Sequence, residues 1–262
     1  MVSVSVLIPV YNCEKWIRRS LDSVKAQTFT DFEVVVVDNN CTDDTIKIIK
    51  EEYSDCLDLK IVECKDKGIE AALNTGLRNC SGKWIARQDG DDLWYPDKLQ
   101  KQISFLDENP HIQILGTQIR LLDVDGVVQE EGTMGKSFTY PTESNDIVVA
   151  MLYGQNPICH PSVVFSRDLI NTVGGYEKLF TLAEDLHLWL KCVPHFKFAN
   201  LSEVLVDYTQ KLDDRYDART PLIAADMYYN LYKAVGLVQG EREERVWHWQ
   251  LDPNAHGNKT GG

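Results

Sequence analysis

The fold is decided by the stretch KWIARQDGDDLWYPDK at residues 83–98. Residues 83–87 form a predicted strand, and Pro96 suits the first turn of a helix that runs to about residue 109. The acids between them then lie beyond the carboxyl end of a strand, where open α/β sheets bind ligands. Three carboxylates within four positions repel one another unless a cation or many donors offset their charge. This stretch alone favours a divalent-metal loop and an acidic, solvated turn equally.

Strand and helix patterns alternate through the first 110 residues. Strands are predicted at residues 4–8, 32–37, 57–62 and 83–87, and helices at residues 12–27, 42–53, 68–79 and 96–109. Asn12 is expected to cap the first helix, and Thr42 or Asp43 the second. The alternation predicts an α/β fold with a mainly parallel sheet, right-handed crossovers and helices on both faces.

The second half of the chain has a mixed pattern. Strands are predicted at residues 112–115, 118–122, 162–165, 196–198 and 204–208, and helices at residues 147–153, about 184–190 and 221–238. Asp123-Val124-Asp125-Gly126 reads as a hairpin turn, and residues 130–146 as a loop. We therefore expect one domain over residues 1–238 and a flexible tail at residues 239–262.

Composition limits the classes of function. The chain has 262 residues, of which 44% are hydrophobic, and a formal net charge of -13. That charge argues against a nucleic-acid partner, because binding to a phosphate backbone needs a basic face. Seven cysteines without a CxxC pair favour reduced thiols. With no recognisable signal peptide or membrane-length apolar run, we expect a cytoplasmic protein, soluble or peripherally membrane-associated. The sequence does not indicate the oligomeric state.

Several common phosphate and metal motifs are absent. The turn after the first strand reads PVYNCE at residues 9–14, without the glycines of a dinucleotide fingerprint, and no P-loop pattern occurs. An EF-hand loop beginning at Asp89 fails at Leu93, Trp94 and Gln100. What remains is a nucleotide site built from a strand-end aromatic, a strand-end acid and the acid loop.

Five segments in order resemble the inverting glycosyltransferases of family 2, which have the GT-A fold. They are SVLIPVYN at 5–12, QTFTDFEVVVVD at 27–38, GIEAALNTG at 68–76, DGDD at 89–92 and AEDLHLWL at 183–190. The match covers about residues 3–210. It implies a Rossmann-like nucleotide-binding half at residues 1–110 and an acceptor-side half at residues 111–238. It also implies a nucleotide-sugar donor, expected to be UDP-linked, and a carbohydrate or glycoconjugate acceptor.

The resemblance assigns roles on the donor side. Pro9 and Tyr11 would line the base pocket, and Asp38 would accept the uracil N–H. Ordinary packing for Tyr11 and helix capping for Asp38 are the alternatives. The chain departs from the family at residues 39–41, where Asn-Asn-Cys replaces the usual Asp-Gly-Ser. Asparagine tolerates the left-handed turn that glycine favours, so the loop is expected to keep its shape.

The acid loop would hold the metal. Asp91 corresponds to the residue that ligates Mn²⁺ or Mg²⁺ across the diphosphate, and Asp89 to one that contacts the ribose or the metal through water. Asp92 is a possible sugar contact. Relatives carry a further histidine after the last strand, but residues 209–215 contain none, which leaves the third ligand open.

The resemblance places the proton chemistry on the late helix. Asp185 matches the general base, which must approach the sugar from the face opposite the leaving diphosphate. Glu184 and His160 are possible acceptor or sugar contacts. The alternatives are a helix-dipole role for the two acids and a structural role for His160.

The expected activity is therefore metal-dependent, inverting transfer of a sugar, in the manner of a hexosyltransferase, to an acceptor hydroxyl. A catalytically inactive nucleotide-sugar or glycan-binding protein of the same fold is the alternative. The retained Asp185 favours the enzyme. The transferred sugar, the acceptor and the linkage are not encoded in any of these motifs.

Overall fold

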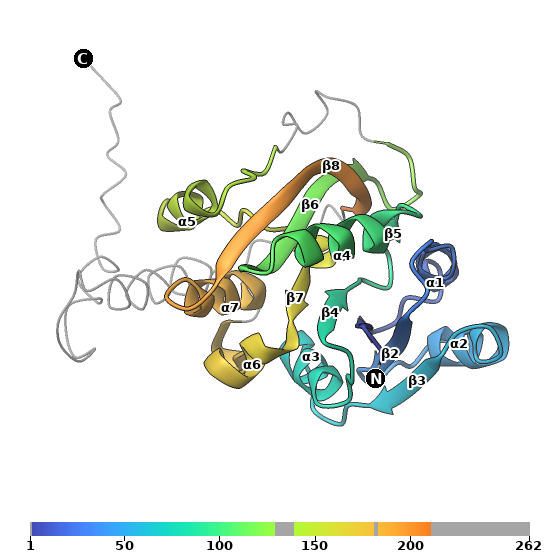
Figure 1. Ribbon diagram of the computed structural model, residues 1–262. Coiled ribbons are helices and arrows are strands. Elements are labelled where there is room, and N and C mark those ends of the chain that lie inside the picture. Colours follow the sequence, from blue (N-terminus) through green and yellow to red (C-terminus); the bar gives the residue numbers. More distant parts are fainter. Residues whose placement is uncertain (1, 129–138, 181–182, 211–262) are drawn as a thin grey trace, which may run out of the picture.

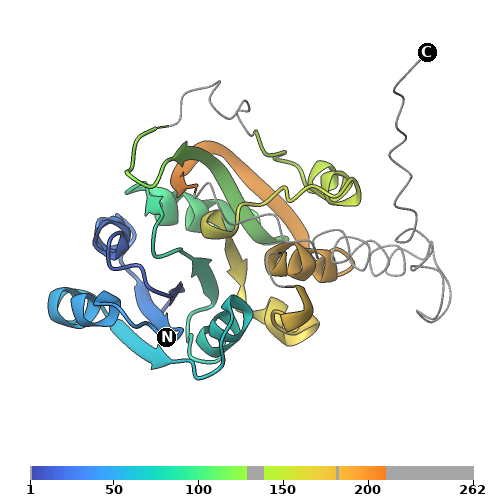
Figure 2. The same ribbon diagram turned by 180° about the vertical axis from the view of Figure 1, so that it is seen from behind.

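A computed structural model describes residues 2–128, 139–180 and 183–210 (Figure 1). Its centre is an eight-stranded sheet with the strand order β3-β2-β1-β4-β7-β6-β8-β5. Helices cover both faces of this sheet, as the two opposite views show (Figures 1 and 2). The described residues thus form an α/β fold with a mixed sheet.

The elements have the following bounds. The strands are β1 (Val4–Val10), β2 (Phe32–Asp38), β3 (Leu59–Glu63), β4 (Trp84–Arg87), β5 (Leu93–Trp94), β6 (Ile112–Leu122), β7 (Val164–Ser166) and β8 (Lys197–Thr209). The α-helices are α1 (Ile17–Lys25), α2 (Thr45–Tyr53), α3 (Ile69–Leu77), α4 (Lys98–Glu108), α5 (Ser144–Leu152), α6 (Arg167–Val173) and α7 (Glu184–Cys192). Short 3-10 helices lie at His160–Ser162 and Lys178–Phe180.

The first four strands in the sheet order confirm the predicted parallel arrangement. β1 pairs in parallel with β2 and β4, and β2 pairs in parallel with β3. Residues along β1 and β2 alternate between two cores. Leu7, Val35 and Val37 pack with α3, whereas Val6, Val34 and Val36 pack with α1 and α2. Both faces are therefore apolar, which explains the uninterrupted run of β-branched residues in β2.

The second half contains fewer and longer strands than predicted. Residues 112–115 and 118–122 belong to one strand, β6, and residues 196–198 and 204–208 to another, β8. β6 and β8 pair in parallel along this length, with register shifts on both sides of Gln118. The sequence pattern breaks at this irregularity, although the hydrogen-bonded pairing continues. The hairpin turn at Asp123 is confirmed, because its Oδ1 accepts the N–H groups of Asp125 and Val127.

Three local predictions were wrong or incomplete. Asn12 does not cap α1, which begins at Ile17; its φ is 48° and its side chain bonds Thr42 instead. The pair Leu93–Trp94 was assigned to no strand but forms β5, antiparallel to β8. The helix α6 was not predicted. A strand of two residues is decided by its partner strand, which local sequence does not reveal.

Some expectations fall on other parts of the chain. The predicted helix at 221–238, the tail at 239–262 and most of the 130–146 loop lie outside the described residues. Residues 1–238 as one domain therefore stay a prediction. All seven cysteines are free. Among the described helices, none has the length and apolar character needed to cross a membrane.

One side chain ties the two halves of the chain together. Asn74 of α3 donates from Nδ2 to the carbonyl of Tyr176 at 2.7 Å, and its Oδ1 accepts the N–H of Tyr176 at 2.9 Å. Gly175 makes room for this amide, since a Cβ there would lie 2.1 Å from Asn74 Oδ1. The segment leading to α7 is thus fixed against the parallel half of the sheet.

The close packing of Gly82 against β1 can be tested by substitution. A Cβ at Gly82 would lie 2.5 Å from the Ser5 nitrogen, a backbone atom of the central strand. We expect Gly82→Ala to lower the free energy of unfolding by about 1–3 kcal/mol, because β1 must shift. Urea unfolding measures the loss. Val127→Ala, at a side chain that is 60% exposed, serves as the control; equal stability of both variants would contradict the packing.

Candidate active site

The acid loop lies between β4 and β5, as predicted for a strand-end site. Asp89, Asp91 and Asp92 each offer a carboxylate oxygen, and these oxygens lie within 4.8 Å of one another. Asp89 and Asp91 are half-buried, and Asp92 is 1% exposed. The loop therefore brings three carboxylates into the space of a single cation.

The backbone of this loop is held by donors from neighbouring elements. The Ser20 hydroxyl donates to the Asp89 carbonyl at 2.7 Å, and Arg19 Nη2 donates to the Asp91 carbonyl at 3.0 Å. Gln88 Nε2 donates to the Asp92 carbonyl at 2.9 Å. Because the carbonyls are bound in this way, the loop keeps its path despite the repulsion between its carboxylates.

Asp92 joins the loop to the end of β8. Its Oδ1 accepts the Thr209 N–H at 2.7 Å, and the Thr209 hydroxyl donates to the Asp91 carbonyl at 2.6 Å. Burial, and then the charges of Asp89 and Asp91, raise the pKa of the Asp92 carboxyl well above its ordinary value. These contacts describe a strut between loop and strand. The sugar contact foreseen for Asp92 stays a prediction.

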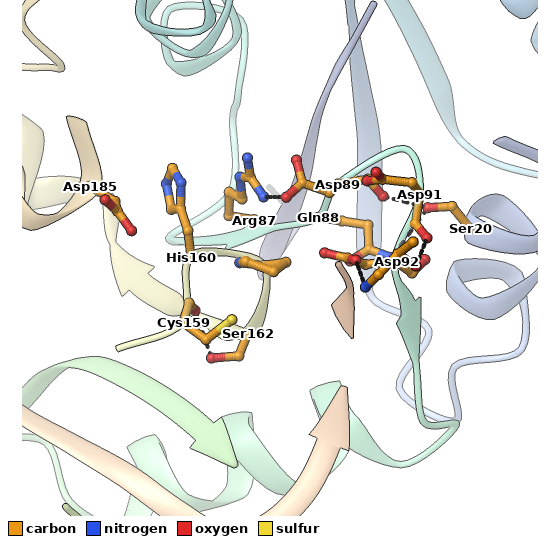
Figure 3. Close-up of polar contacts among 12 residues, drawn as sticks. Ser20, Arg87, Gln88, Asp89, Asp91, Asp92, Cys159, His160, Ser162 and Asp185 are labelled. Carbon is orange, nitrogen blue, oxygen red and sulfur yellow. Dashed lines mark hydrogen bonds and ion pairs between the residues drawn. The ribbon is translucent and has the colours of Figure 1, made fainter. Parts of the chain in front are cut away.

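Asp89 has a cationic partner that the motifs did not suggest. Arg87, the last residue of β4, is 3% exposed and forms an ion pair with the Asp89 carboxylate (Figure 3). Burial opposes this charge, but Asp89 outweighs it and raises the pKa of Arg87 above its ordinary value. The guanidinium is therefore a permanent positive charge inside the site.

A pocket opens beside the acid loop at the ends of β1 and β2. It has a volume of about 630 Å³. Its lining includes Pro9, Tyr11, Asn39, Asp89 and Asp91. The Tyr11 side chain is 63% exposed, so its ring is available for stacking. The structure thus brings the predicted base-pocket residues and the acid loop to one cavity.

Asn39 is a wall residue that the sequence reasoning missed. Its Nδ2 donates to the Gly68 carbonyl at 3.1 Å, while its buried Oδ1 has no hydrogen-bond partner among the described residues. Asp38 is not part of the described pocket wall, and its Oδ1 accepts the Cys41 N–H at 2.8 Å. The base contact foreseen for Asp38 stays a prediction. In the sequence, the departure from the family pattern at residue 39 was the signal that could have pointed to Asn39.

The turn after β2 keeps the shape foreseen for it. Asn40 has a φ of 67°, the left-handed conformation that glycine otherwise supplies. Asn12, with a φ of 48°, accepts the Thr42 N–H on its Oδ1 at 2.8 Å. Two asparagines in left-handed conformations therefore shape the pocket rim.

Asp185 is the second residue of α7, at the other end of the site. Its Oδ2 accepts a hydrogen bond from Asn156 Nδ2 at 2.7 Å, and its Oδ1 accepts the Leu186 N–H at 2.7 Å. Burial raises the pKa of Asp185 above its ordinary value, although Asn156, the Leu186 N–H and the charge of Arg87 oppose this shift. Two donors thus orient the carboxylate that was predicted to be the base.

Glu184 shares the first turn of α7 with Asp185. Burial, followed by the charge of Asp185, raises its pKa to about 7, and Arg87 acts in the opposite direction. Its Oε2 has no hydrogen-bond partner among the described residues. Burial therefore favours the protonated form of Glu184 more than an exposed glutamate would allow.

His160 is buried within the site wall. Its Nε2 lies 2.9 Å from the Tyr176 hydroxyl, and its ring packs edge-on against Trp189 at 6.1 Å. Burial, and then the Arg87 charge, lower its pKa well below the ordinary value, so the imidazole is neutral. This environment supports a structural role, and the acceptor or sugar contact of His160 stays a prediction.

The chemistry that this site can support follows from the ligand atoms it offers. Carboxylate oxygens suit a hard divalent cation, and the three clustered acids fit such an ion. Asp92 Oδ2 is buried and has no hydrogen-bond partner among the described residues, which agrees with this fit. Asp185 stands apart from them, on the far side of Arg87 and His160 in the view of Figure 3. The site therefore contains a cluster of three carboxylates and, apart from it, the carboxylate of Asp185.

Comparisons with known proteins agree with this geometry. The family model described as glycosyl transferase family 2 matches residues 5–172. EpsE of Bacillus subtilis is 31% identical over 246 residues, which cover 88% of this chain and 81% of that protein. The O-antigen biosynthesis glycosyltransferase WbnJ of Escherichia coli is 32% identical over 212 residues, 78% of each chain.

Solved structures share the fold. Staphylococcus aureus TarS 1–349 in complex with UDP-GlcNAc superposes with a TM-score of 0.71 at 24% identity and covers 91% of this chain and 68% of its own. The mannosyltransferase PcManGT of Pyrobaculum calidifontis, in complex with GDP-Man and Mn²⁺, has a TM-score of 0.61 at 21% identity, covering 92% and 65%. Both neighbours support the GT-A architecture of the described residues.

The strut from Asp92 to Thr209 can be tested by substitution. Asp92→Ala leaves the buried Thr209 N–H without an acceptor, and we expect it to cost about 1–3 kcal/mol of unfolding free energy. Asp92→Asn keeps an acceptor oxygen and removes one repelling charge, so it should be at least as stable as the native chain. Denaturant unfolding of the metal-free protein measures both. Equal stabilities of the two variants would contradict the strut.

Proposed function

The chain belongs to glycosyltransferase family 2, and we propose that it transfers a sugar from a UDP-sugar to an acceptor hydroxyl with inversion at the anomeric carbon. That the protein is a glycosyltransferase is shown by the family match and by its relatives. The donor, the metal and the stereochemistry are proposals. They rest above all on one observation, the continuity of the Tyr11 pocket with the acid loop.

Asp185 acts as the general base in this proposal. The acceptor hydroxyl gives its proton to Asp185 while its oxygen attacks the anomeric carbon, and the bond to the diphosphate oxygen breaks. The carboxylate is held in place by Asn156 and by the Leu186 N–H, which leaves it oriented toward one acceptor position. No covalent intermediate with the enzyme is required, because base and leaving group occupy different sides.

The acid loop holds the leaving group. Asp91 would ligate Mn²⁺ or Mg²⁺, with Asp89 close enough to contribute directly or through water. When bound, the cation neutralises the charge that develops on the departing diphosphate. The fixed carbonyls of the loop keep the carboxylates ready for this ion before the donor arrives.

The identity of the base depends on the pocket wall. Asn39 Oδ1 is a buried acceptor without a described partner, and its amide nitrogen is occupied by Gly68. A base that presents an N–H at this position would satisfy it, as the N3–H of uracil does. TarS was solved with UDP-GlcNAc and PcManGT with GDP-Man, so the GT-A fold alone does not choose between them. We propose uracil because the exposed Tyr11 ring and the Asn39 acceptor fit a small base.

The proposed roles of Asp91 and Asp185 predict that substituting the first abolishes metal-dependent UDP binding and substituting the second abolishes only transfer. We expect UDP with Mn²⁺ to raise the melting temperature of the native protein, and Asp91→Asn to abolish that rise because the ion loses its ligand. Asp185→Asn should keep the rise yet lower UDP-sugar transfer by at least about a hundredfold. Differential scanning fluorimetry and a UDP-release assay measure the two effects.

Asp125→Asn is the matched control for the metal residue. Asp123-Val124-Asp125 repeats the Asp-x-Asp pattern but forms an exposed turn. The rise in melting temperature with UDP and Mn²⁺ and the rate of UDP-sugar transfer should therefore both be unchanged in this variant. A larger rise in melting temperature with GDP than with UDP would refute uracil as the base of the donor nucleotide. Metal-dependent UDP binding without turnover of any donor would favour the inactive binding protein.

The raised pKa values of Asp185 and Glu184 predict the pH dependence. Transfer needs Asp185 ionised, and burial raises the pKa of Asp185 above its ordinary value, so kcat/KM should fall as the pH drops through the titration of that carboxyl. Glu184→Gln removes the neighbouring negative charge and should therefore move this acid limb to lower pH. Pre-steady-state transfer measured between pH 5 and 9 tests the shift. An unchanged or higher acid limb would contradict the coupling.

A further inference from the structure

A second cavity, with a volume of about 740 Å³, opens between α3, α6 and α7. The helices α3 and α6 lie side by side in both ribbon views (Figures 1 and 2). The segment 174–177 completes the wall, and the described lining residues of this cavity and of the Tyr11 pocket do not overlap. A cavity of this size holds a small organic molecule, and none of the roles assigned above uses it.

The wall of this cavity is positively charged, although the whole chain has a formal net charge of -13. Arg78, Arg167 and Lys191 line it, and Glu177 is the acid among its described lining residues. These three positive charges and one negative charge give the wall a net charge of +2. Charges of one sign gathered in a hollow attract the opposite sign more strongly than they would on a flat surface, so the cavity favours an anion.

The two arginines have no carboxylate partner in the described part of the chain. Arg78 Nη2 donates to the Thr75 hydroxyl at 3.0 Å, and Arg167 Nη1 donates to the Cys80 carbonyl at 3.3 Å. By contrast, the exposed Arg18 forms an ion pair with a glutamate. A guanidinium carries more N–H groups than one such contact uses. Each arginine is therefore held by a neutral acceptor and keeps its charge and further donors for a ligand.

Lys191 is held in place on the α7 side of the cavity. Its Nζ donates to Glu177 Oε1 at 2.9 Å and to the Gly175 carbonyl at 3.2 Å, which leaves a further N–H group of the ammonium for a ligand. The segment that carries Glu177 is fixed in turn by the two hydrogen bonds between Asn74 and Tyr176. This part of the wall is thus ordered before a ligand arrives, which lowers the entropic cost of binding.

We propose that this cavity is a second ligand site, which binds the phosphate group of a small molecule through Arg78, Arg167 and Lys191. A phosphate monoester carries about 1.5 to 2 negative charges at pH 7 and so balances the charge of the wall, whereas a carboxylate leaves one positive charge unbalanced. The forked guanidinium groups also match pairs of phosphate oxygens. This binding needs no nucleotide sugar, metal or acceptor.

Isothermal titration calorimetry with inorganic phosphate and with glucose 6-phosphate tests the site in the metal-free protein. We expect both probes to bind the native chain at constant ionic strength. Arg78→Gln and Arg167→Gln should each raise the dissociation constant at least about tenfold, because each removes a charged contact to the phosphate. Arg167→Lys keeps the charge without the fork, so its affinity should lie between those of the native chain and Arg167→Gln.

Lys67→Gln is the matched control for phosphate bound elsewhere. Lys67 lines the Tyr11 pocket, so its loss should leave the affinity for both probes unchanged. Thermal unfolding of the ligand-free variants checks the fold. Because the Arg78 side chain is exposed, we expect Arg78→Gln to melt as the native chain does, and its weaker binding then reports the lost contact and not unfolding.

Co-sedimentation with vesicles distinguishes a soluble phosphate from one carried by a lipid. Phosphatidylcholine vesicles with and without phosphatidic acid are compared for the native chain and for Arg78→Gln/Arg167→Gln. Sedimentation that requires both phosphatidic acid and the two arginines would assign the phosphate to a lipid head group. Binding of glucose 6-phosphate without such sedimentation would assign it to a soluble ester.

The proposal is overturned if the native chain binds none of these probes, or if Arg78→Gln and Arg167→Gln bind them as tightly as the native chain. Loss of binding in Lys67→Gln alone would likewise overturn it, because the phosphate would then occupy the Tyr11 pocket. Failure of phosphate binding would leave the proposed sugar transfer standing. Absence of transfer by the native protein would refute the proposed function and leave this second site unaffected.

Discussion

The close approach of three carboxylates is the constraint on which the site depends. Oxygens within 4.8 Å repel by at least about 3 kcal/mol per ionised pair at an effective dielectric constant of 20. That is a large part of the roughly 5–15 kcal/mol that stabilises a typical domain. The loop persists because α1, β8 and Gln88 hold its carbonyls and because Arg87 lies beside it. The repulsion is thus kept in place rather than relieved, and a divalent ion would relieve it.

The sheet explains how such different groups meet. β1, β2 and β4 are adjacent and parallel, so the turns after them open at one edge and supply Tyr11, Asn39 and the acid loop. Asp185 comes from α7, which packs through Trp189 onto Phe165 of β7. β7 in turn runs antiparallel to β4, the strand that ends in Arg87. In the proposed function, the donor would therefore bind at strand ends, and the base would come from a helix laid against the same sheet.

Patterns local in sequence predicted the parallel half and the acid loop well. The β-branched run of β2 and the strand-helix alternation depend on periodicity, which a single sequence displays. Pro9, Tyr11, Asp89 and Asp91 line one pocket, as expected of strand ends that share an edge of a parallel sheet, while their roles there stay predictions. The resemblance to a known family, rather than periodicity, is what pointed to Asp185.

What escaped prediction depends on contacts between distant segments. β5 exists only because β8 pairs with it, and the continuity of β6 is hidden by its register shift. Arg87 reads as the polar end of a short strand, and local sequence reveals neither its burial nor its ion pair with Asp89. Asn39 was noticed as a departure from the family pattern. Its amide nitrogen bonds the Gly68 carbonyl, 29 positions away, and its Oδ1 has no partner among the described residues, which local sequence does not reveal.

The donors that Thr209 gives to the acid loop also bear on how the protein is made. The Thr209 N–H reaches Asp92 across 117 positions, and Asn74 reaches Tyr176 across 102. A ribosome delivers the acid loop long before it delivers β8, so the early chain carries the crowded carboxylates without their last two donors. Closing such long loops is slow, because chain entropy is lost before the contacts form. Completion of the site is therefore a late event of biosynthesis, coupled to the arrival of the final strand of the sheet.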